Sequence, residues 1–458
     1  MATFPFELSI QCAAADGQAE QVICNKHLRV IPRNREVFDA IWKGKSIVLK
    51  VFTGKARASR RLKREWQGLL RLRERSVPAP RPLFYGRTQD GRLAIAIEKI
   101  SNCPTLRDLF AAADKDQKID LLLKLARQLA LQHQKGIKQE DLHLDNFMLA
   151  GDRIYVLDPG QIRFFPGPLD RKKSTSQLAL LARYLPAEDN RAISRLCREY
   201  FAQRGWNLEE GDEQNIHRYI ELHTRRTIRR TLRKCLRTSK RQLRIRTGPY
   251  LAVFKREFCA TADPGQLIKQ IDDLMSKGQI LKNGNTCFIS RLTWNSRDVV
   301  IKRYNHKGIF HSLRHTIKRS RARHGWLHAH RLEVLNIPTP KPMAYIELRR
   351  GPLVWTSYLL TEYVEGRKLY YYLRDKKISQ AERLAATKRI LQLIAKLGKY
   401  GITHGDLKPS NILITQNGPV LTDLDSMQAH KSRWFCKLRW AADAASIDRL
   451  NEQFVHTE

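Results

Sequence analysis

The chain has 458 residues, more than one hydrophobic core usually supports, so two domains of about 200 residues are expected. Hydrophobic residues make up 42% of the sequence, which excludes wholesale disorder, and no apolar run reaches the length of about 18 residues that a spanning helix needs. The formal net charge of +39 predicts a polyanionic partner: nucleic acid, an acidic lipid surface or a phosphorylated glycan.

The cysteines and the N-terminus bear on location. Eight cysteines occur singly and never as a CxxC pair, so neither a zinc site nor a disulfide framework is indicated. Residues 1–10 carry neither an early positive charge nor a long apolar stretch, which matches a signal peptide poorly. A reducing, cytoplasmic location is therefore expected.

The expected elements of the first half alternate between strands and helices. A hairpin over 41–50 precedes a helix that carries Glu65. A leucine-rich helix over 116–135 then leads to two short apolar runs, 147–149 and 154–157. The order helix, loop, hairpin is the local pattern.

A basic segment, residues 225–246, holds eleven Lys or Arg and no acidic residue. Its apolar residues at helical spacing predict a basic amphipathic helix that lies on anionic lipid or grips phosphates. The alternative is a solvated helix that packs a narrow apolar stripe. The helix is assigned to the first of two domains, 1–250 and 251–458, and a second basic run covers 302–331.

The second half is expected to repeat this order. A hairpin over 280–302 comes first, and a helix over 379–399 opens with a capping box of Ser379 and Glu382. An Asn-Gly pair at 417–418 predicts a tight turn between two short strands.

Two segments, 137–160 and 402–425, share one pattern: an Asp, an Asn five residues later, and a second Asp seventeen residues after the first. The residues are Asp141, Asn146 and Asp158 in one copy and Asp406, Asn411 and Asp423 in the other. Upstream, IVLK ending at Lys50 matches VVIK ending at Lys302, and VPAPRP matches IPTPKP. Such a long period indicates a duplicated domain.

This spacing suits phosphoryl transfer from Mg·ATP. The first Asp of each loop, Asp141 or Asp406, is placed to orient the acceptor hydroxyl. The Asn and the second Asp supply hard oxygen ligands for Mg²⁺, and the strand lysine would contact the α- and β-phosphates of ATP. One such loop is a weak signal, but two copies with equal spacing are strong.

These residues resemble the protein-kinase-like superfamily, and HGDLKPSN with the DLD ending is similar to the bacterial lipopolysaccharide core kinases, which include heptose and 3-deoxy-octulosonic acid (Kdo) kinases. The resemblance implies an α+β fold of two tandem bilobal kinase-like domains, the second with a short C-lobe. It implies ATP and Mg²⁺ as cofactors and a catalytic role for Lys408. It also implies that the acceptor is a sugar hydroxyl of lipopolysaccharide core or another anionic glycolipid, reached by peripheral contact with the cytoplasmic face of the inner membrane.

Each half departs from the kinase pattern in a different place. Neither has a glycine-rich phosphate loop. The first half has Gln139 for the loop histidine, but it keeps Glu65, on a helix, as an ion-pair partner for the strand lysine. In the second half the corresponding helix position is Gly325, which leaves Glu333 as a candidate replacement. We place the chemistry first in the second half, whose loop fits better.

Other interpretations remain open. The stretch after Asp423, with one helix expected over 434–454, leaves no room for a peptide-binding platform, so a protein substrate is disfavoured and a sugar or lipid headgroup is favoured. The alternative enzyme is a protein Ser/Thr kinase or a small-molecule kinase. A partly inactive scaffold that binds polyanions is a third reading, and nucleic acid is unlikely because no recognition motif occurs. His133 and His143 are read as structural or phosphate-facing, and residues 370–372, three tyrosines, as packing at a helix start.

Overall fold

The structure is a computed structural model, and it describes residues 3–13, 18–31, 34–53, 57–101, 103–186, 189–259, 263–305, 320–351, 353–430 and scattered positions between 432 and 445. The chain divides into two compact units, Met1–His223 and Thr224–Glu458. None of the described helices combines the length and the apolar composition that a membrane span requires.

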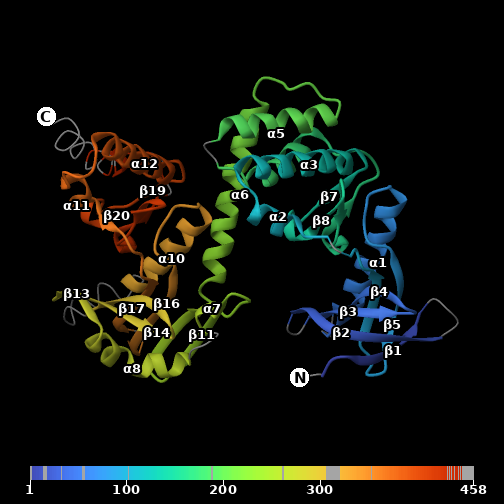
Figure 1. The fold of residues 1–458 in the computed structure, drawn as a ribbon, viewed down its shortest axis with the longest axis horizontal. Coiled ribbons are helices and arrows are strands. Elements are labelled where there is room, and N and C mark those ends of the chain that lie inside the picture. The colour runs from blue at the N-terminus through green and yellow to red at the C-terminus, as the bar shows by residue number, and fades with distance from the viewer. Residues whose placement is uncertain are drawn as a thin grey trace. The chain divides into compact units, whose positions relative to one another are not determined.

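Unit 1 opens with a closed six-stranded barrel in the order β1-β2-β3-β4-β6-β5, blue in Figure 1. Its strands are β1 (Phe6–Cys12), β2 (Ala19–Ile31), β3 (Arg35–Trp42), β4 (Lys45–Phe52), β5 (Pro82–Thr88) and β6 (Leu93–Glu98). Helix α1 (Ala58–Glu74) lies between β4 and β5 in sequence and turns its apolar side to the barrel. The turn of the β3–β4 hairpin has positive φ at Lys43 and Gly44, which suits the strand twist.

A helical part follows the barrel in unit 1. It consists of α2 (Leu106–Ala112), α3 (Lys115–Gln134), β7 (Ile137–Gln139), β8 (Phe147–Ala150), β9 (Arg153–Val156), β10 (Ile162–Phe164), α4 (Arg171–Ala182) and α5 (Asn190–Gln203). Helix α6 (Asp212–Lys234) begins in this part and continues past His223 into unit 2. The core forms where α3, α4 and α5 bury their apolar faces around the β8–β9 hairpin. Helix α3 starts at a capping box of Asp114 and Gln117, which fixes the helix that precedes the first Asp loop.

Unit 2 replaces the barrel with an open seven-stranded sheet in the order β11-β12-β16-β17-β15-β14-β13. The strands are β11 (Gln242–Thr247), β12 (Tyr250–Lys255), β13 (Gln279–Gly284), β14 (Cys287–Trp294), β15 (Arg297–Tyr304), β16 (Pro342–Arg350) and β17 (Leu353–Glu362). Helices α7 (Arg256–Cys259), α8 (Pro264–Lys277) and α10 (Arg321–Val334) belong to this sheet, and α8 packs on one side of it.

Within the described residues, the helical part of unit 2 is smaller than that of unit 1. It comprises β18 (Arg367–Lys368), α11 (Leu369–Arg374), α12 (Gln380–Lys399), β19 (Ile402–Thr403), β20 (Ile412–Thr415), β21 (Gly418–Leu421) and β22 (Gln428–Ala429). The predicted capping box of Ser379 and Glu382 opens α12, and β20 and β21 form the predicted hairpin. The mixture of strands and helices expected in both halves is confirmed. Of the helix expected over 434–454, the described positions between 434 and 445 are helical, and the rest lies outside the described residues. Residues 306–319 of the basic run 302–331 also lie outside them. Tyr370 and Tyr371 on α11 are 39% and 56% exposed, so the expectation that the tyrosines of this run pack is wrong for these two.

The basic segment differs from its prediction in two ways. The helix expected over 225–246 ends at Lys234, and Gln242–Thr247 is strand β11, because Leu243 and Ile245 alternate with exposed arginines and pair with β12. Its apolar residues also pack inside unit 2: Ile228 joins the core under α10 and α12, and Cys235 packs with Trp326. The division at 223/224 therefore lies earlier in the chain than the expected boundary after residue 250.

Candidate active sites

The first Asp loop joins β7 to β8 in unit 1. Asn146 donates from Nδ2 to the main-chain oxygen of Asp141 at 2.9 Å, which locks the loop across its five-residue span. His143 Nε2 lies 3.2 Å from Asp141 Oδ1, and both side chains are exposed. His143 is thus the neighbour of the loop carboxylate, which the sequence interpretation left undecided.

The second Asp loop has the same build in unit 2, with more contacts. Asn411 donates from Nδ2 to the main-chain oxygen of Asp406 at 2.9 Å and to its Oδ2 at 3.1 Å. Lys408 Nζ donates to Asp406 Oδ2 at 2.8 Å, so a fixed cation stands where unit 1 has a histidine. Asp443 accepts from the main-chain N–H groups of His404 and Gly405 at 2.7 and 3.2 Å, which holds the entry to the loop.

The residue two positions before the loop Asp also differs between the units: it is His404 in unit 2 and Gln139 in unit 1. His404 Nε2 donates to the main-chain oxygen of Thr422 at 3.0 Å, so it ties the loop to the residue before Asp423. Burial lowers the pKa of His404, although the Thr422 hydrogen bond opposes this, and the ring is held neutral. In unit 1 Gln139 donates to Gln132 instead, within the buried interior.

The strand lysine of unit 1 has the expected partner. Lys50 on β4 pairs with Glu65 on α1, and both are buried. Arg35 on β3 adds a contact that the sequence did not suggest: its Nη1 lies 3.3 Å from Glu65 Oε2 and its Nη2 lies 3.7 Å from Asp158 Oδ2. A guanidinium therefore bridges the helix carboxylate and the predicted metal ligand Asp158.

The strand lysine of unit 2 has a different partner. Lys302 Nζ donates to Asp423 Oδ1 at 2.9 Å. The candidate Glu333 is wrong, because it pairs with Lys255 at 2.6 Å and with His330 at 2.7 Å. At Gly325 a Cβ would come within 2.8 Å of a Leu359 methyl group, so any side chain at this helix position requires Leu359 to shift.

Helix α10 is tied to the metal loop instead. Arg321 Nε donates to Asp425 Oδ2 at 2.8 Å, and Nη2 contacts the same oxygen. The Arg321 guanidinium also lies 4.6 Å from the centre of the Tyr304 ring. The Asp425 side chain is 3% exposed and that of Arg321 is 51% exposed, so the pair joins a buried carboxylate to a half-exposed cation.

In each unit an arginine pairs with a carboxylate of the loop that follows the short hairpin, Arg35 with Asp158 and Arg321 with Asp425. The two arginines, however, stand at different positions of the repeat. By strand register Arg35 corresponds to Cys287, since each lies two residues before the partner of the strand lysine, Val37 or Ile289. Helix position 61 in unit 1, Arg61, corresponds to Arg321, but it donates to Asn34. The second loop carboxylate, Asp425, corresponds to Gly160.

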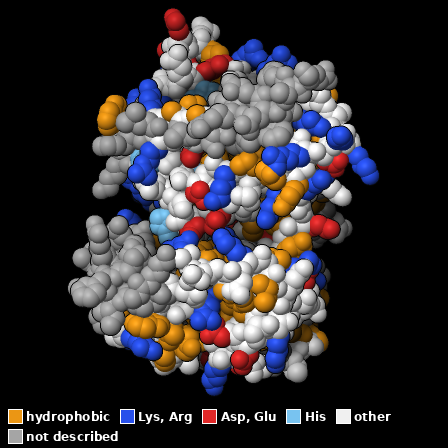
Figure 2. Space-filling view, turned by 90° about the vertical axis from the view of Figure 1, so that its left-hand side faces the viewer, with side chains coloured by type: hydrophobic (Ala, Val, Ile, Leu, Met, Phe, Trp, Pro, Cys, Tyr) orange, Lys and Arg blue, Asp and Glu red, His pale blue; other side chains and the backbone are white. Residues whose placement is uncertain are grey.

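The charged side chains of the second Asp loop shift one another's pKa values. Burial alone raises the pKa of Asp423, but the hydrogen bond with Asp425 and the Lys302 ammonium outweigh it and hold that pKa low. Burial and the neighbouring Asp423 raise the pKa of Asp425. The hydrogen bond to Asp406 raises the pKa of Lys408, with further contributions from the charges of Asp423 and Asp425. Figure 2 shows acidic side chains gathered in the middle of this face, between basic side chains.

The donor set of unit 2 fits a hard divalent cation. Two carboxylates, Asp423 and Asp425, interact directly, and Asn411 uses its Nδ2 on Asp406, which leaves the amide oxygen as a ligand. Within the described residues no three His, Cys, Asp or Glu side chains form a complete metal cage. Mg²⁺ usually takes one or two carboxylates together with substrate phosphates and water.

Unit 1 fits a cation less well. Asp158 has Gly160 at the position of Asp425, and Arg35 already lies against its carboxylate. Gly68 on α1 permits close contact with Pro159, since a Cβ there would lie 2.8 Å from that ring. The loop after Asp158 is therefore pressed onto the helix and held by a cation of the chain itself.

Arg35, Arg321, Asp425 and Asp443 are the residues that sequence reasoning missed. For two of them a signal was present, because Asp425 belongs to the DLD ending and Arg321 stands at the repeat position of Arg61. Arg35 has Cys287 as its counterpart, so the comparison of the two halves gives no signal for it.

Comparisons with known proteins agree with the loops. A sequence model of the lipopolysaccharide kinase (Kdo/WaaP) family matches residues 45–200 and 276–454. A probable serine/threonine-protein kinase of Dictyostelium discoideum is 32% identical over 74 residues, 16% of this chain and 11% of its own. A sperm motility kinase of Mus musculus is 38% identical over 64 residues, 14% of this chain and 13% of its own. The chain thus spans a small part of these relatives.

A solved structure, vaccinia related kinase 3, aligns with 50% of this chain and 93% of its own at 9% identity, with a TM-score of 0.33. The family match, by contrast, extends over most of the chain and includes both Asp loops. The chain therefore belongs to the lipopolysaccharide kinase (Kdo/WaaP) family and is a phosphotransferase.

Proposed function

We propose that this chain transfers the γ-phosphoryl group of ATP, with Mg²⁺, to a sugar hydroxyl of lipopolysaccharide core or another anionic glycolipid. The observation that supports this most is the set of contacts in unit 2 that hold Asp406 against Lys408 at 2.8 Å and Asn411 at 3.1 Å, and Asp423 against Lys302 at 2.9 Å. Such a cluster joins a proton acceptor, metal ligands and a cation within one loop system, as phosphoryl transfer requires.

The proposed step has a simple balance. Asp406 orients the acceptor hydroxyl and takes its proton, while the hydroxyl oxygen bonds to the γ-phosphorus and the bond from that phosphorus to the bridging oxygen of ADP breaks. Lys408 offsets charge on the transferred group, and Lys302 contacts the α- and β-phosphates. Bound Mg²⁺ would supply charge neutralisation of the phosphates, with Asn411 and Asp423 as its ligands.

Unit 1 is proposed to bind nucleotide without efficient transfer. Arg35 neutralises Asp158 directly, and Asp141 has His143 beside it in place of a lysine. The chain is proposed to work in the cytoplasm at the inner membrane surface, where its charge of +39 would favour contact with anionic lipid.

The test uses matched loop variants. Transfer from labelled ATP to dephosphorylated core glycolipid should fall by at least about a hundredfold in Asp406→Asn, because the proton acceptor is lost, and by much less in Asp141→Asn. A thermal-shift titration with Mg·ATP should still show binding by both variants. Full transfer by the Asp406→Asn, Asp141→Asn double variant would refute the proposal.

A protein kinase is the second candidate, because the Dictyostelium relative named above is a probable serine/threonine-protein kinase. Offering a mixed Ser/Thr peptide library in the same assay separates the two. Efficient peptide labelling with no glycolipid labelling would favour the second candidate. A chain that shows no thermal shift at millimolar Mg·ATP would instead be a binding scaffold.

A further inference from the structure

Unit 1 contains a pocket between helix α1 and the segment that follows Asp158. Its volume of about 370 Å³ is that of a small-molecule site. A face of α1 forms one wall, and the turn after Asp158 together with strand β10 forms the other. The described residues that line the pocket include neither Lys50 nor Asp158, so it is separate from the proposed nucleotide site of unit 1.

The wall from α1 is basic. Arg64, Gln67 and Arg71 recur at intervals of three and four residues, so their side chains share one face of the helix. Both arginines are exposed, and neither forms an ion pair with a carboxylate of the described residues. Arg71 instead lies over the ring of Phe164, with its guanidinium carbon 5.5 Å from the ring centre. This wall therefore presents two guanidinium groups that the described part of the chain does not neutralise.

The opposite wall adds a cation and an acid that already pair with each other. Arg163 Nε on β10 lies 3.0 Å from Glu140 Oε1, and Lys138 Nζ lies 3.0 Å from the same oxygen. The main-chain N–H of Glu140 donates to the main-chain oxygen of Gln161 at 2.8 Å, which ties this wall to the backbone beside Asp141. With three arginines and one glutamate among its lining residues, the pocket carries an excess of positive charge.

Unit 2 fills the corresponding place with its own side chains. His324 stands at the repeat position of Arg64, and its Nε2 donates to a main-chain oxygen of the second loop at 2.7 Å. His328 stands at the position of Gly68, and its ring centre lies 4.5 Å from that of His324. Arg331 Nη1 lies 3.0 Å from His328 Nδ1. Since the fold can close this groove with imidazole rings, the open form lined by arginines is a property of the unit 1 sequence.

We propose that the pocket of unit 1 binds a small phosphate monoester whose remaining part carries hydroxyl groups, such as a sugar phosphate. Arg64 and Arg71 would hold the phosphate, because guanidinium groups bind phosphate oxygens through paired N–H donors. The two arginines are about 10 Å apart along the helix axis, a span that two long side chains close from either end.

The rest of the pocket decides the rest of the ligand. A single phosphate ion would leave most of the 370 Å³ empty. Gln67 and the Glu140 carboxylate offer hydrogen-bonding groups for hydroxyls, and the charge of Glu140 is already offset by its two cations. The site goes beyond the proposed phosphoryl transfer and does not depend on which unit performs it.

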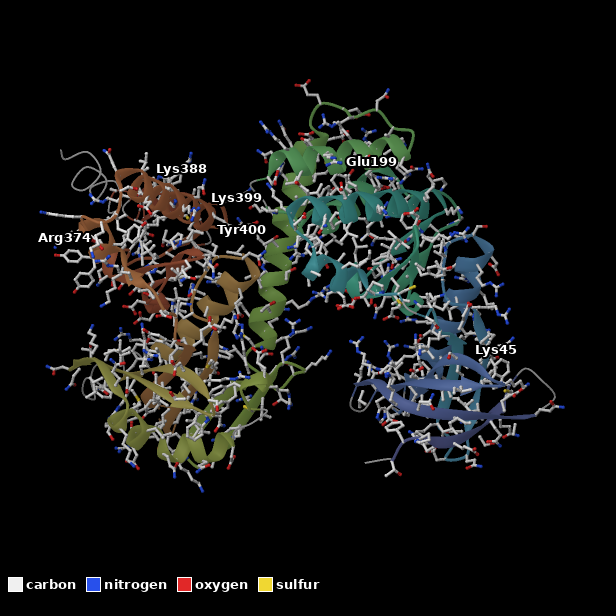
Figure 3. All side chains as sticks on the ribbon, in the orientation of Figure 1. Lys45, Glu199, Arg374, Lys388, Lys399 and Tyr400 are labelled. Carbon is white, nitrogen blue, oxygen red and sulfur yellow. The ribbon has the colours of Figure 1, made fainter. Side chains whose placement is uncertain are left out.

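The alternative is that these arginines only add to the net charge of +39, which attracts any anion. Two control residues separate the cases. Arg73 is exposed on the same helix but does not line the pocket, because the side chain two residues after Arg71 points to another face. Lys45, which Figure 3 shows on the barrel, is exposed at the start of β4. General attraction predicts equal losses when any of these charges is removed.

The test is calorimetry of the full chain with glucose 6-phosphate, in the presence of a saturating, non-hydrolysable Mg·ATP analogue that fills the nucleotide sites. The dissociation constant should rise about tenfold in Arg64→Gln and in Arg71→Gln. It should stay within twofold in Arg73→Gln and in Lys45→Gln. Glucose should show no saturable binding, and inorganic phosphate should bind more weakly than glucose 6-phosphate.

Four results would overturn the proposal. They are no saturable binding of glucose 6-phosphate by the full chain, equal losses in all four variants, displacement of glucose 6-phosphate by the nucleotide analogue, and equal affinity for inorganic phosphate and glucose 6-phosphate. Because the assay involves no transfer, its outcome is independent of the loop variants that test the proposed function.

Discussion

The ion pair between Arg321 and Asp425 makes a testable link between helix α10 and the metal loop. Removing one partner of a buried ion pair costs about 3–5 kcal/mol, because a charge remains without compensation. Since Arg321 is half exposed, we expect about 2 kcal/mol for Arg321→Gln. Asp425→Asn should cost less than about 1 kcal/mol, because water can solvate the remaining guanidinium and the repulsion with Asp423 disappears.

The measurement is hydrogen exchange in peptides that cover α10, which reports the local opening free energy. Arg321→Gln should speed exchange about 30-fold, and adding Asp425→Asn to it should restore much of the protection. Arg61→Gln is the matched control on α1, where the hydrogen-bond partner is the neutral Asn34. A double variant that exchanges as fast as Arg321→Gln would refute the reasoning.

Three further predictions concern stability. Burial, followed by the charge of Arg204, lowers the pKa of His133 to about 3, so the free energy of unfolding of unit 1 should fall by about 2 kcal/mol between pH 6.5 and pH 5, and denaturant titrations of His133→Gln should lack this fall. Gly325→Ala should bring no gain in the native chain, where its Cβ meets Leu359, but about 1 kcal/mol in a Leu359→Ala background, measured by thermal unfolding. Ser379→Ala should cost about 1 kcal/mol of α12 stability by hydrogen exchange, because the capping box is lost.

Local features could be predicted from the sequence because they depend on neighbours in the chain. The capping box at Ser379, the hairpin turn at 417–418 and the helix before each Asp loop follow from short-range spacing. The pairing of Lys50 with Glu65 also follows, because the strand and the helix are consecutive in the sequence and the two residues are 15 positions apart.

Features that depend on tertiary placement could not be predicted. The contact of Arg321 with Asp425 joins residues that are 104 positions apart. Aligning the two repeats does not tell where either side chain points. Strand β11 was mistaken for helix because apolar spacing from 228 to 236 suits a helix, while the alternation that makes a strand starts only at Leu243.

The two units carry an acidic residue and a glycine at opposite positions of the repeat, Glu65 and Gly160 in unit 1 and Gly325 and Asp425 in unit 2. This has a consequence for sequence variation in the family. In unit 1 the carboxylate that holds the strand cations sits on the helix, at Glu65, and the loop has Gly160. In unit 2 the helix has Gly325, the strand cation Lys302 pairs with Asp423 of the loop, and the second loop carboxylate, Asp425, holds the helix cation Arg321. A single substitution from one arrangement toward the other either leaves a cation without a partner or crowds two acids together. Among related domains, we therefore expect an acidic helix position and an acidic second loop position to replace each other and seldom to occur together.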